Sequence, residues 1–362
     1  MNNEQLKDRF EGCLLGGAAG DALGYVVEFW REEEIFARFG EGGIKTLAQA
    51  ATLSHTAVAR FSDDTQMTLF TGAGIALATS ADRTPTVADI LRAYQDWLGT
   101  QGDTSRMAGP DQPATWLYSI GALHALRAPG NTCLSALRSL PEGGSIEHPA
   151  NDSKGCGGVM RVAPVGLAAA VRDDVDAAQL AAEAAALTHD HPLGWLPAAV
   201  LALVVQRLVL HSTEDCGSAD AAFELLKNIV SESAANVAER YSSYRHAAVL
   251  QGLVAEAVSL AQNARAGKGH DLEHIHELGE GWVGDEALAI AVYAALAHVD
   301  DVAAALGCAV NHKGDSDSTG AVAGNILGAL YGRARLEQVF DLARLEERDL
   351  ITTVADQLLG RV

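Results

Sequence analysis

Two runs of glycine at four-residue spacing, one near each end of the chain, constrain the fold more than any other feature of the sequence. The runs are Gly12, Gly16, Gly20 and Gly24, and Gly320, Gly324, Gly328 and Gly332. Residues four apart share one face of an α-helix, where each glycine costs up to about 1 kcal/mol relative to alanine. Close approach of two helix backbones would offset this cost. We therefore expect the helix near 4–20 to pack against the helix near 319–331. The alternative is that the first run unwinds near Gly20–Gly24.

Helical patterns dominate the rest of the sequence, and alternating runs of β-branched residues are scarce. Thr86–Asp89 is typical of a capping box at a helix start. Further helices are expected near 176–187, 195–211, 219–235, 245–264, 285–298, 301–310, 319–331 and 335–359. Polar and glycine-rich composition favours long loops at 100–115 and 140–158. Since no linker or fixed-period repeat divides the chain, the sequence predicts a single all-α domain over residues 1–362.

Charge and hydropathy exclude several classes of partner. The chain has 26 Lys and Arg against 47 Asp and Glu, and its net charge of −21 at pH 7 repels nucleic acid and anionic lipid. The longest apolar run, Leu193–Val205, contains Gly194 and Pro197 and is shorter than a bilayer requires. The N-terminal segment is polar and shows no apolar signal sequence. We therefore expect no nucleic-acid partner and no membrane partner.

The cysteines indicate a reducing compartment. They are odd in number, far apart and without a Cys-x-x-Cys pair, which favours free thiols over a disulfide framework or a zinc knot. This pattern predicts a cytoplasmic location. The five are Cys13, Cys133, Cys156, Cys216 and Cys308.

Ser62, Asp63, Asp64 and Thr65 form the first polar cluster that points to chemistry. The cluster precedes an apolar helical run over Met67–Leu77. Ser and Asp are common N-caps, and simple capping is one explanation. Adjacent carboxylates repel each other unless a cation or a helix N-terminus lies near, so the cluster is also a candidate metal site.

Asp315, Asp317 and Ser318 belong to a second cluster that leads into an apolar helix. Two Asp residues at positions one and three resemble a calcium-binding loop, but position twelve is Ile326 instead of the required Glu. Both clusters offer only oxygen ligands, which favours Mg²⁺ or Mn²⁺ over Zn²⁺. Four carboxylates are enough to hold two such ions. The alternative is again a polar helix start.

Asp21 and Glu28 are two further acidic residues near the first glycine run. Asp21 lies among the glycines at the expected helix end, and Glu28 lies in the segment that follows. Packing of the two glycine faces would place both acids beside the cluster at 315–318. Taken alone, the pattern around Glu28 favours a solvated surface residue.

Ser153, Lys154, Gly155 and Cys156 lie in the glycine-rich segment 151–161. Such a segment presents backbone N–H groups to a phosphate in some proteins, although an ordinary glycine-rich turn is the simpler explanation. The segment matches neither a Walker loop nor a dinucleotide fingerprint. Cys156 also lacks the Cys–His–Asn pattern of a thiol nucleophile.

His189 and His191 lie two residues apart, directly before Pro192. This spacing fits a metal-binding pair. It fits a polar helix C-terminus equally well, because His near the last turn interacts favourably with the helix dipole.

Together and in this order, these segments resemble the ADP-ribosylglycohydrolase family, which includes the dinitrogenase-reductase-activating glycohydrolases and the animal ADP-ribosylhydrolases. The resemblance runs from about Gly12 to Gly332. It rests on GCLLGGAAGDALG with the following Glu28, and on SDDT, NDSKGCGGVMRVAPVGL, THDHPLGW, GWVGDEALA and GDSDSTGAVAGNILGA. The resemblance implies a compact orthogonal helical domain with two Mg²⁺ or Mn²⁺ ions in a central cleft.

The resemblance also implies roles for individual residues. The implied metal ligands are Ser62, Asp63, Asp64, Asp315, Asp317 and Ser318. The implied contacts to ADP-ribose are Ser153, Lys154, Gly155, Cys156 and His189. Cys156 replaces an Asn that is common in the family, and Ser318 replaces a common Thr. Glu28 matches an acidic residue on a mobile loop beside the metals in some relatives.

The activity that the resemblance implies is hydrolysis of the bond between ADP-ribose and a modified protein side chain. Cleavage builds positive charge on the ribose, and Glu28, Asp64 or Asp317 would accept the proton of the attacking water. We expect an arginine linkage, because an acidic cleft favours a guanidinium leaving group. The alternatives are a serine linkage, poly-ADP-ribose, O-acetyl-ADP-ribose, or a non-catalytic protein like the crystallins of this family. Because the family also includes immunity factors, an ADP-ribosyltransferase toxin is a further candidate partner.

Overall fold

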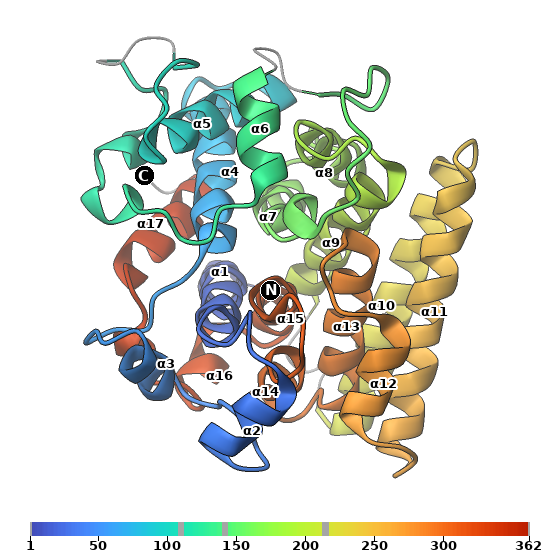
Figure 1. Ribbon diagram of the computed structural model, residues 1–362. Helices are drawn as coiled ribbons and strands as arrows, with labels where there is room; N and C mark the ends of the chain where they lie inside the picture. Colours follow the sequence, from blue (N-terminus) through green and yellow to red (C-terminus); the bar gives the residue numbers. More distant parts are fainter. Residues whose placement is uncertain (1, 108–111, 140–143, 212–216, 361–362) are drawn as a thin grey trace.

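The computed structural model describes residues 2–107, 112–139, 144–211 and 217–360. Within these ranges the chain forms α-helices and short 3-10 turns and contains no strand, which confirms the predicted all-α fold (Figure 1). The α-helices are α1 (Asn3–Tyr25), α2 (Glu32–Phe39), α3 (Leu47–Leu53), α4 (Asp63–Ser80), α5 (Val87–Thr100), α6 (Asn131–Ser139), α7 (Ala163–Val171), α8 (Ala177–Ala186), α9 (Pro192–Leu210), α10 (Ala219–Arg240), α11 (Arg245–Arg265), α12 (Asp271–Leu278), α13 (Gly284–Ala297), α14 (Val302–Val310), α15 (Ser316–Tyr331), α16 (Arg333–Glu337) and α17 (Arg348–Leu358). The 3-10 turns are η1 (Trp116–Ser119), η2 (Gly121–Leu123), η3 (Cys156–Gly158) and η5 (Leu342–Arg344).

The glycine faces of α1 and α15 meet near the middle of the fold, where the two helices run antiparallel (Figure 1). A Cβ atom at Gly20 would overlap the carbonyl oxygen of Gly320, and one at Gly324 would overlap the carbonyl oxygen of Gly16. The two backbones are therefore in direct contact, as the glycine spacing predicts. Helix α1 stays helical through Gly24, so the unwinding alternative is wrong.

Helix α9 is a core helix with the length of a membrane span. It is 19 residues long with a mean hydropathy of 1.9, so by length and composition it is able to cross a membrane. The expectation that this run is too short is therefore wrong, because the helix continues through Pro197 and beyond Val205. Its apolar surface is covered by the protein itself. Of its most apolar window, 78% is buried, with α7, α8 and α13 among the helices packed on it.

The predicted helix over 335–359 is broken in the structure into α16, η5 and α17. The break occurs because this segment pairs with a distant loop. Ala59 N donates to Arg344 O (2.6 Å), and Glu346 N donates to Ala59 O (3.0 Å). Glu347 then takes a left-handed φ of 49° directly before α17 begins. Tertiary pairing thus overrides the local preference for helix.

The other helix predictions are confirmed to within a few residues at most ends. Asp89 accepts from Thr86 N (3.0 Å), which confirms the capping box of α5. Apart from Thr100, which ends α5, the described parts of the two long loops contain no α-helix, and 108–111 and 140–143 lie outside the described residues. The helices α2, α3, α6, α7 and α12 were not predicted from the sequence.

Candidate active site

The first acidic cluster forms the N-terminal turn of α4. Ser62 is the N-cap, and its hydroxyl oxygen accepts a hydrogen bond from Asp64 N (3.1 Å). Asp21 of α1 supports the same turn, because its carboxylate accepts from Ser62 N (2.8 Å), Thr65 N (3.0 Å) and Thr65 Oγ1 (2.5 Å). Since the amides of this turn already have partners, the carboxylates of Asp63 and Asp64 are left to face a cavity.

The second acidic cluster begins α15 and contacts the first. Asp315 is the N-cap, and its Oδ1 accepts from Ser318 N (3.2 Å). Asp317 Oδ1 accepts from the same amide (3.0 Å). Ser318 Oγ donates to Asp64 Oδ2 (2.8 Å), which joins the two clusters. Both clusters are helix starts, so the capping explanation is correct for each. Both also line one cavity, and their role as a metal site stays a prediction.

The cavity between these helix starts has a volume of about 490 Å³. Glu28 reaches it from the turn after α1, and contact of Gly24 with the backbone of Ser316 holds that turn beside α15. Glu28 is only 8% exposed, so its interpretation as a surface residue is wrong, and its Oε2 has no hydrogen-bond partner. The described lining residues are Glu28, Phe29, Asp63, Asp64, Ala128, Pro129, Gly130, Asn131, Thr132, Cys133, Gly155, Cys156, Gly157, Met160, His189, Trp282, Asp315, Asp317 and Ser318.

Burial and mutual repulsion raise the pKa of the carboxyl groups in this cavity. Loss of solvent raises the pKa of Asp63 to about 8. Loss of solvent, followed by the charge of Asp315, raises the pKa of Glu28 to about 9. Burial and neighbouring carboxylates also raise the pKa values of Asp64 and Asp317 well above their ordinary value. No Lys or Arg is among the described lining residues. A cation is therefore needed to keep all these groups ionised at neutral pH.

The glycine-rich loop contributes a further wall of the cavity through Gly155 and Cys156. Gly155 N donates to Ser153 Oγ (3.4 Å), and Cys156 N donates to Trp282 O (3.3 Å). The thiol of Cys156 donates to Asp315 Oδ2 (2.8 Å), which ties the loop to the second acidic cluster. Two amides of the loop are therefore already paired within the protein.

His189 reaches the cavity because a glycine leaves room for it, since a Cβ atom at Gly157 would lie 2.7 Å from the imidazole Cε1. The fully buried Arg161 donates to Thr188 Oγ1 (2.7 Å), and Thr188 Oγ1 lies 2.8 Å from His189 Nδ1. With Arg161 as its donor, the Thr188 hydroxyl has two acceptors in reach, His189 Nδ1 at 2.8 Å and Ala185 O at 3.5 Å. The shorter contact favours donation to Nδ1, which leaves the ring proton on Nε2. Burial, with a smaller effect of Arg161, lowers the pKa of His189 to about 3. The ring is thus a neutral hydrogen-bond donor.

Comparison with known proteins assigns the chain to a family. The model of the family described as ADP-ribosylglycohydrolase matches residues 2–362. The chain belongs to this family. The ADP-ribosyl-[dinitrogen reductase] glycohydrolase of Rhodospirillum rubrum is 28% identical over 210 residues, and the match covers 58% of this chain but only 60% of that protein.

Other relatives in the comparison cover more of the chain. Uncharacterized protein YegU of Escherichia coli (strain K12) is 27% identical over 331 residues, with coverage of 90% and 88%. ADP-ribosylhydrolase ARH1 of Dictyostelium discoideum is 23% identical over 396 residues, with coverage of 97% and 94%. A solved structure described as an ADP-ribosylglycohydrolase-related protein complex covers 99% of both chains, with a TM-score of 0.58 and 21% identity. That likeness shows the fold of the ADP-ribosylglycohydrolases.

Most of the predicted site residues of this ADP-ribosylglycohydrolase family member line one cavity. They are Glu28, Asp63, Asp64, Gly155, Cys156, His189, Asp315, Asp317 and Ser318. Three others are not among the lining residues: Ser62 caps α4, Ser153 Oγ accepts from Gly155 N, and Lys154 is exposed. His191 does not pair with His189, because it caps α9 and its Nδ1 accepts from Leu193 N (3.0 Å).

The residues that fix the cavity wall around Gly130 were not predicted from the sequence. Asp63 N donates to Arg127 O (3.0 Å), and Gly130 N donates to Asp63 Oδ2 (3.3 Å). Arg127 is held by a two-bond ion pair with Glu346 (2.9 and 3.1 Å), and the two side chains are 10% and 12% exposed. The partners lie 219 residues apart, so no spacing pattern reveals them.

An aromatic pair at the cavity was also missed. Phe29 and Trp282 line the cavity and stack with ring centroids 6.1 Å apart and an interplanar angle of 20°. They are 73% and 39% exposed, so they lie where the cavity opens to solvent. The available signal was the position of Phe29 beside Glu28, and of Trp282 within the segment GWVGDEALA of this family.

Proposed function

We propose that this chain is a divalent-metal-dependent hydrolase that removes ADP-ribose from modified arginine side chains of proteins. One observation carries the proposal: five carboxylates face one cavity with no cationic side chain among its described lining residues. The five are Glu28, Asp63, Asp64, Asp315 and Asp317. Membership in the ADP-ribosylglycohydrolase family supports hydrolysis of ADP-ribosyl groups, and metal dependence is typical of that family.

The residues present fit a hard divalent cation. The carboxylates and the Ser318 hydroxyl are all oxygen donors, the type that Mg²⁺ and Mn²⁺ prefer. Glu28 Oε2 is buried without a partner, and the raised pKa values indicate charge that lacks compensation. All five carboxylates belong to the described residues, and no three of them have ligand oxygens within 4.8 Å of one another. Bound ions would therefore have to draw the carboxylates together. We propose that Asp63, Asp64, Asp315 and Asp317 hold two Mg²⁺ ions, with Mn²⁺ as the alternative.

The side chains of the cavity divide the remaining work. A bound divalent ion supplies positive charge that orients ribose hydroxyls and makes water a better nucleophile at neutral pH. Glu28 accepts the proton of the attacking water, because its free Oε2 is available while Asp64 and Asp317 are held by Ser318. His189 donates from Nε2 to the ADP-ribose. Gly155 and Cys156 border the sugar, and the exposed Lys154 and the nearby Ser153 approach the diphosphate.

Two features of the cavity favour arginine over serine as the modified residue. The acidic field stabilises the positive charge that a guanidinium leaving group carries. Phe29 and Trp282 offer flat aromatic faces at the opening, on which a guanidinium can stack by a cation–π interaction. A serine linkage uses neither feature.

The substrate in this proposal is an ADP-ribosylated protein, and the enzyme acts in the cytoplasm. The described cysteines, Cys13, Cys133, Cys156 and Cys308, are free thiols, which supports a reducing compartment. Cys216 lies outside the described residues. The ADP-ribosyltransferase that modifies the substrate, whether or not it is a toxin, is the enzyme that this hydrolase opposes.

The test is release of ADP-ribose from arginine-linked and serine-linked peptides at equal concentration, with Mg²⁺ and with excess chelator. We expect faster release from arginine, no release in chelator, and recovery with Mg²⁺ or Mn²⁺. Glu28→Gln should lower kcat by roughly 10²- to 10⁴-fold, the usual contribution of a general base.

The matched variants are Asp317→Asn in the cavity and Asp220→Asn on α10, where the side chain is 95% exposed. Only the first should abolish activity, and both should fold. Full activity in chelator would contradict the metal role. Faster release from serine would overturn the linkage alone. No release from any ADP-ribosyl substrate would favour the crystallin-like alternative.

A further inference from the structure

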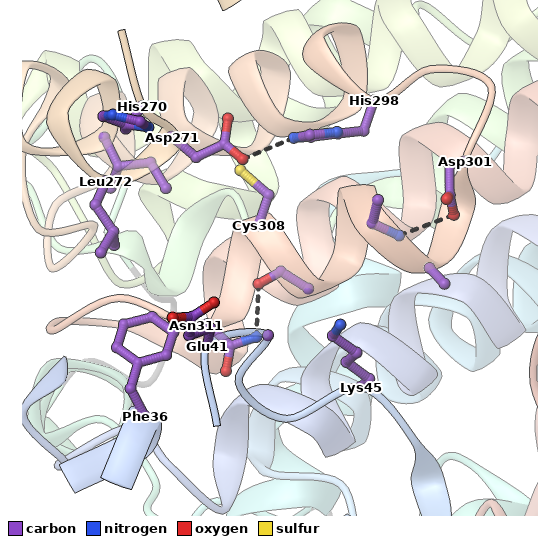
Figure 2. A pocket seen from close by; sticks show the side chains of 15 residues that line it. Phe36, Glu41, Lys45, His270, Asp271, Leu272, His298, Asp301, Cys308 and Asn311 are labelled. Carbon is purple, nitrogen blue, oxygen red and sulfur yellow. Dashed lines mark hydrogen bonds and ion pairs between the residues drawn. The ribbon is translucent and has the colours of Figure 1, made fainter. Parts of the chain in front are cut away.

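A second cavity, with a volume of about 430 Å³, shares no lining residue with the acidic cavity. Figure 2 shows it between α12, the end of α13 and α14. Three side chains of different chemistry meet there: Asp271 from the first turn of α12, His298 at the C-terminus of α13, and Cys308 from α14. Their ligand atoms all lie within 4.8 Å of one another. Among the described residues, no other three His, Cys or acidic side chains converge this closely.

The carboxylate of Asp271 is held so that one oxygen faces the other two groups. Its Oδ1 accepts from the hydroxyl of Tyr293 (2.6 Å), and that hydroxyl lies 2.9 Å from His274 Nδ1. Tyr293 is fully buried, so this support is rigid. Asp271 Oδ2 is left to pair with His298 Nε2 (2.9 Å). Support of a ligating carboxylate by a fixed hydrogen bond is typical of metal sites in proteins.

The order of the three groups argues against a thiol nucleophile. A Cys–His–Asp triad needs the imidazole between the thiol and the carboxylate. Here the carboxylate of Asp271 lies between His298 and the sulfur of Cys308 (Figure 2). A cation placed between the three would contact all of them at once. It would also allow the thiol to ionise beside a carboxylate, which is otherwise unfavourable.

We propose that Asp271, His298 and Cys308 bind a transition-metal ion of the Zn²⁺ class. Thiolate, imidazole and carboxylate are ligands that Zn²⁺ accepts and Mg²⁺ does not prefer. A tetrahedral ion with bonds of about 2.0–2.3 Å needs ligand atoms roughly 3.3–3.6 Å apart. The Asp271–His298 pair at 2.9 Å would therefore open by about half an ångström. Both side chains are partly exposed, at 38% and 29%, which leaves room for that movement.

Binding of the ion has a defined proton balance and a structural consequence. When Nε2 of the neutral His298 ring binds the ion, the ring proton moves to Nδ1, and the thiol proton of Cys308 is released to solvent, so affinity rises with pH. The fourth coordination position faces the cavity and takes water or a small anion. Because the ligands come from α12, α13 and α14, the ion links three helices. Helix α14 packs on α15, so the link lies behind the helix that carries the second acidic cluster.

The test uses Co²⁺ as the probe in the full-length protein, because Co²⁺ bound to thiolate gives a near-ultraviolet charge-transfer band. We expect one Co²⁺ per chain with this band, and its loss when Zn²⁺ is added. Cys308→Ser should remove the band and lower the affinity. Cys156→Ser is the matched control, because Cys156 is also a thiol beside a carboxylate, Asp315. It should retain the band.

Thermal unfolding gives a second readout. With saturating Mg²⁺ present to fill the acidic cavity, Zn²⁺ should raise the Tm of the wild type and of Cys156→Ser by a few degrees, and should leave the Tm of Cys308→Ser and His298→Ala unchanged. His298→Ala covers the case in which Cys308→Ser folds poorly, because the His298 side chain is 29% exposed. A band that survives Cys308→Ser, a band lost in Cys156→Ser, or an equal Tm increase in every variant would overturn the proposal.

Discussion

Replacement of Gly324 by alanine tests whether the glycine faces of α1 and α15 hold the centre of the fold together. A Cβ atom at this position would overlap the carbonyl oxygen of Gly16 and lie 2.8 Å from Gly17 N. Both obstacles are backbone atoms, so no side chain is able to rotate away. The two helices would have to separate by roughly 1.5 Å to restore ordinary contact distances of about 3.5 Å.

Two opposing effects set the size of the change. Alanine favours helix over glycine by roughly 0.5–1 kcal/mol. Overpacking in a core that cannot relax costs about 1–3 kcal/mol or more, and separation of the helices also weakens contacts at the neighbouring glycines. We therefore expect a net loss of about 2 kcal/mol in the free energy of unfolding for Gly324→Ala, and a larger loss for Gly324→Leu. The same separation would displace Asp21 and Glu28 from α15 and lower activity.

The assay is urea unfolding followed by circular dichroism, with the shift in midpoint converted to free energy. Gly252→Ala is the matched control, because Gly252 lies within α11 and a Cβ atom there meets nothing within 4 Å. It should stabilise the protein by roughly 0.5–1 kcal/mol. If Gly324→Ala stabilises the protein as Gly252→Ala does, the close-contact reasoning is refuted.

Two further predictions concern the residues that support the cavity. Glu346→Ala leaves Arg127 buried without its ion-pair partner and should lower the free energy of unfolding in urea by about 3 kcal/mol. The double variant Arg127→Met with Glu346→Leu should recover most of the loss. Equal losses in the single and the double variant would contradict the role of the ion pair. Thr188→Val removes one of the acceptors of Arg161 and the hydroxyl partner of His189. It should raise KM for the ADP-ribosyl substrate and cost about 1–3 kcal/mol of stability. Thr188→Ser should keep the KM and the stability of the wild type. An unchanged KM in Thr188→Val would contradict the role of this hydroxyl.

The sequence reveals the α1–α15 contact because glycine has a cost in helices that only close approach offsets. The same argument correctly places Glu28 beside α15, although its local sequence favours solvent. The two acidic clusters are equally accessible to sequence reasoning, since adjacent carboxylates at a helix start need compensation. That the chain forms a single domain over residues 1–362 stays a prediction.

What the sequence could not reveal depends on contacts between distant segments. The pairing of Ala59 with Arg344 and Glu346 breaks a stretch of good helix formers, and nothing local signals it. The support of Asp63 by Arg127 has the same origin. The tautomer of His189 likewise depends on Arg161, a residue noted only as part of a motif.

Both acidic clusters begin a helix, and this position has a consequence for the dependence of stability on pH. The N-termini of α4 and α15 carry partial positive charge that favours carboxylates. That charge does not compensate for burial, because the pKa of Asp63 is still raised from 3.8 to about 8 and that of Glu28 from 4.5 to about 9. The folded chain therefore holds these protons more tightly than the unfolded chain does.

The free energy of unfolding of the metal-free protein should consequently fall as pH rises from about 4, where the unfolded carboxyl groups ionise, through about 8 to 9, where the folded groups ionise. Saturating Mg²⁺ should restore stability most at the alkaline end of this window, by about 2.7 kcal/mol at a hundredfold excess over Kd. Urea unfolding in chelator and in Mg²⁺ across this pH range measures both effects, and Asp63→Asn should flatten the dependence in chelator. Metal-free stability that stays level or rises through the window would show that burial does not place uncompensated charge in this cavity.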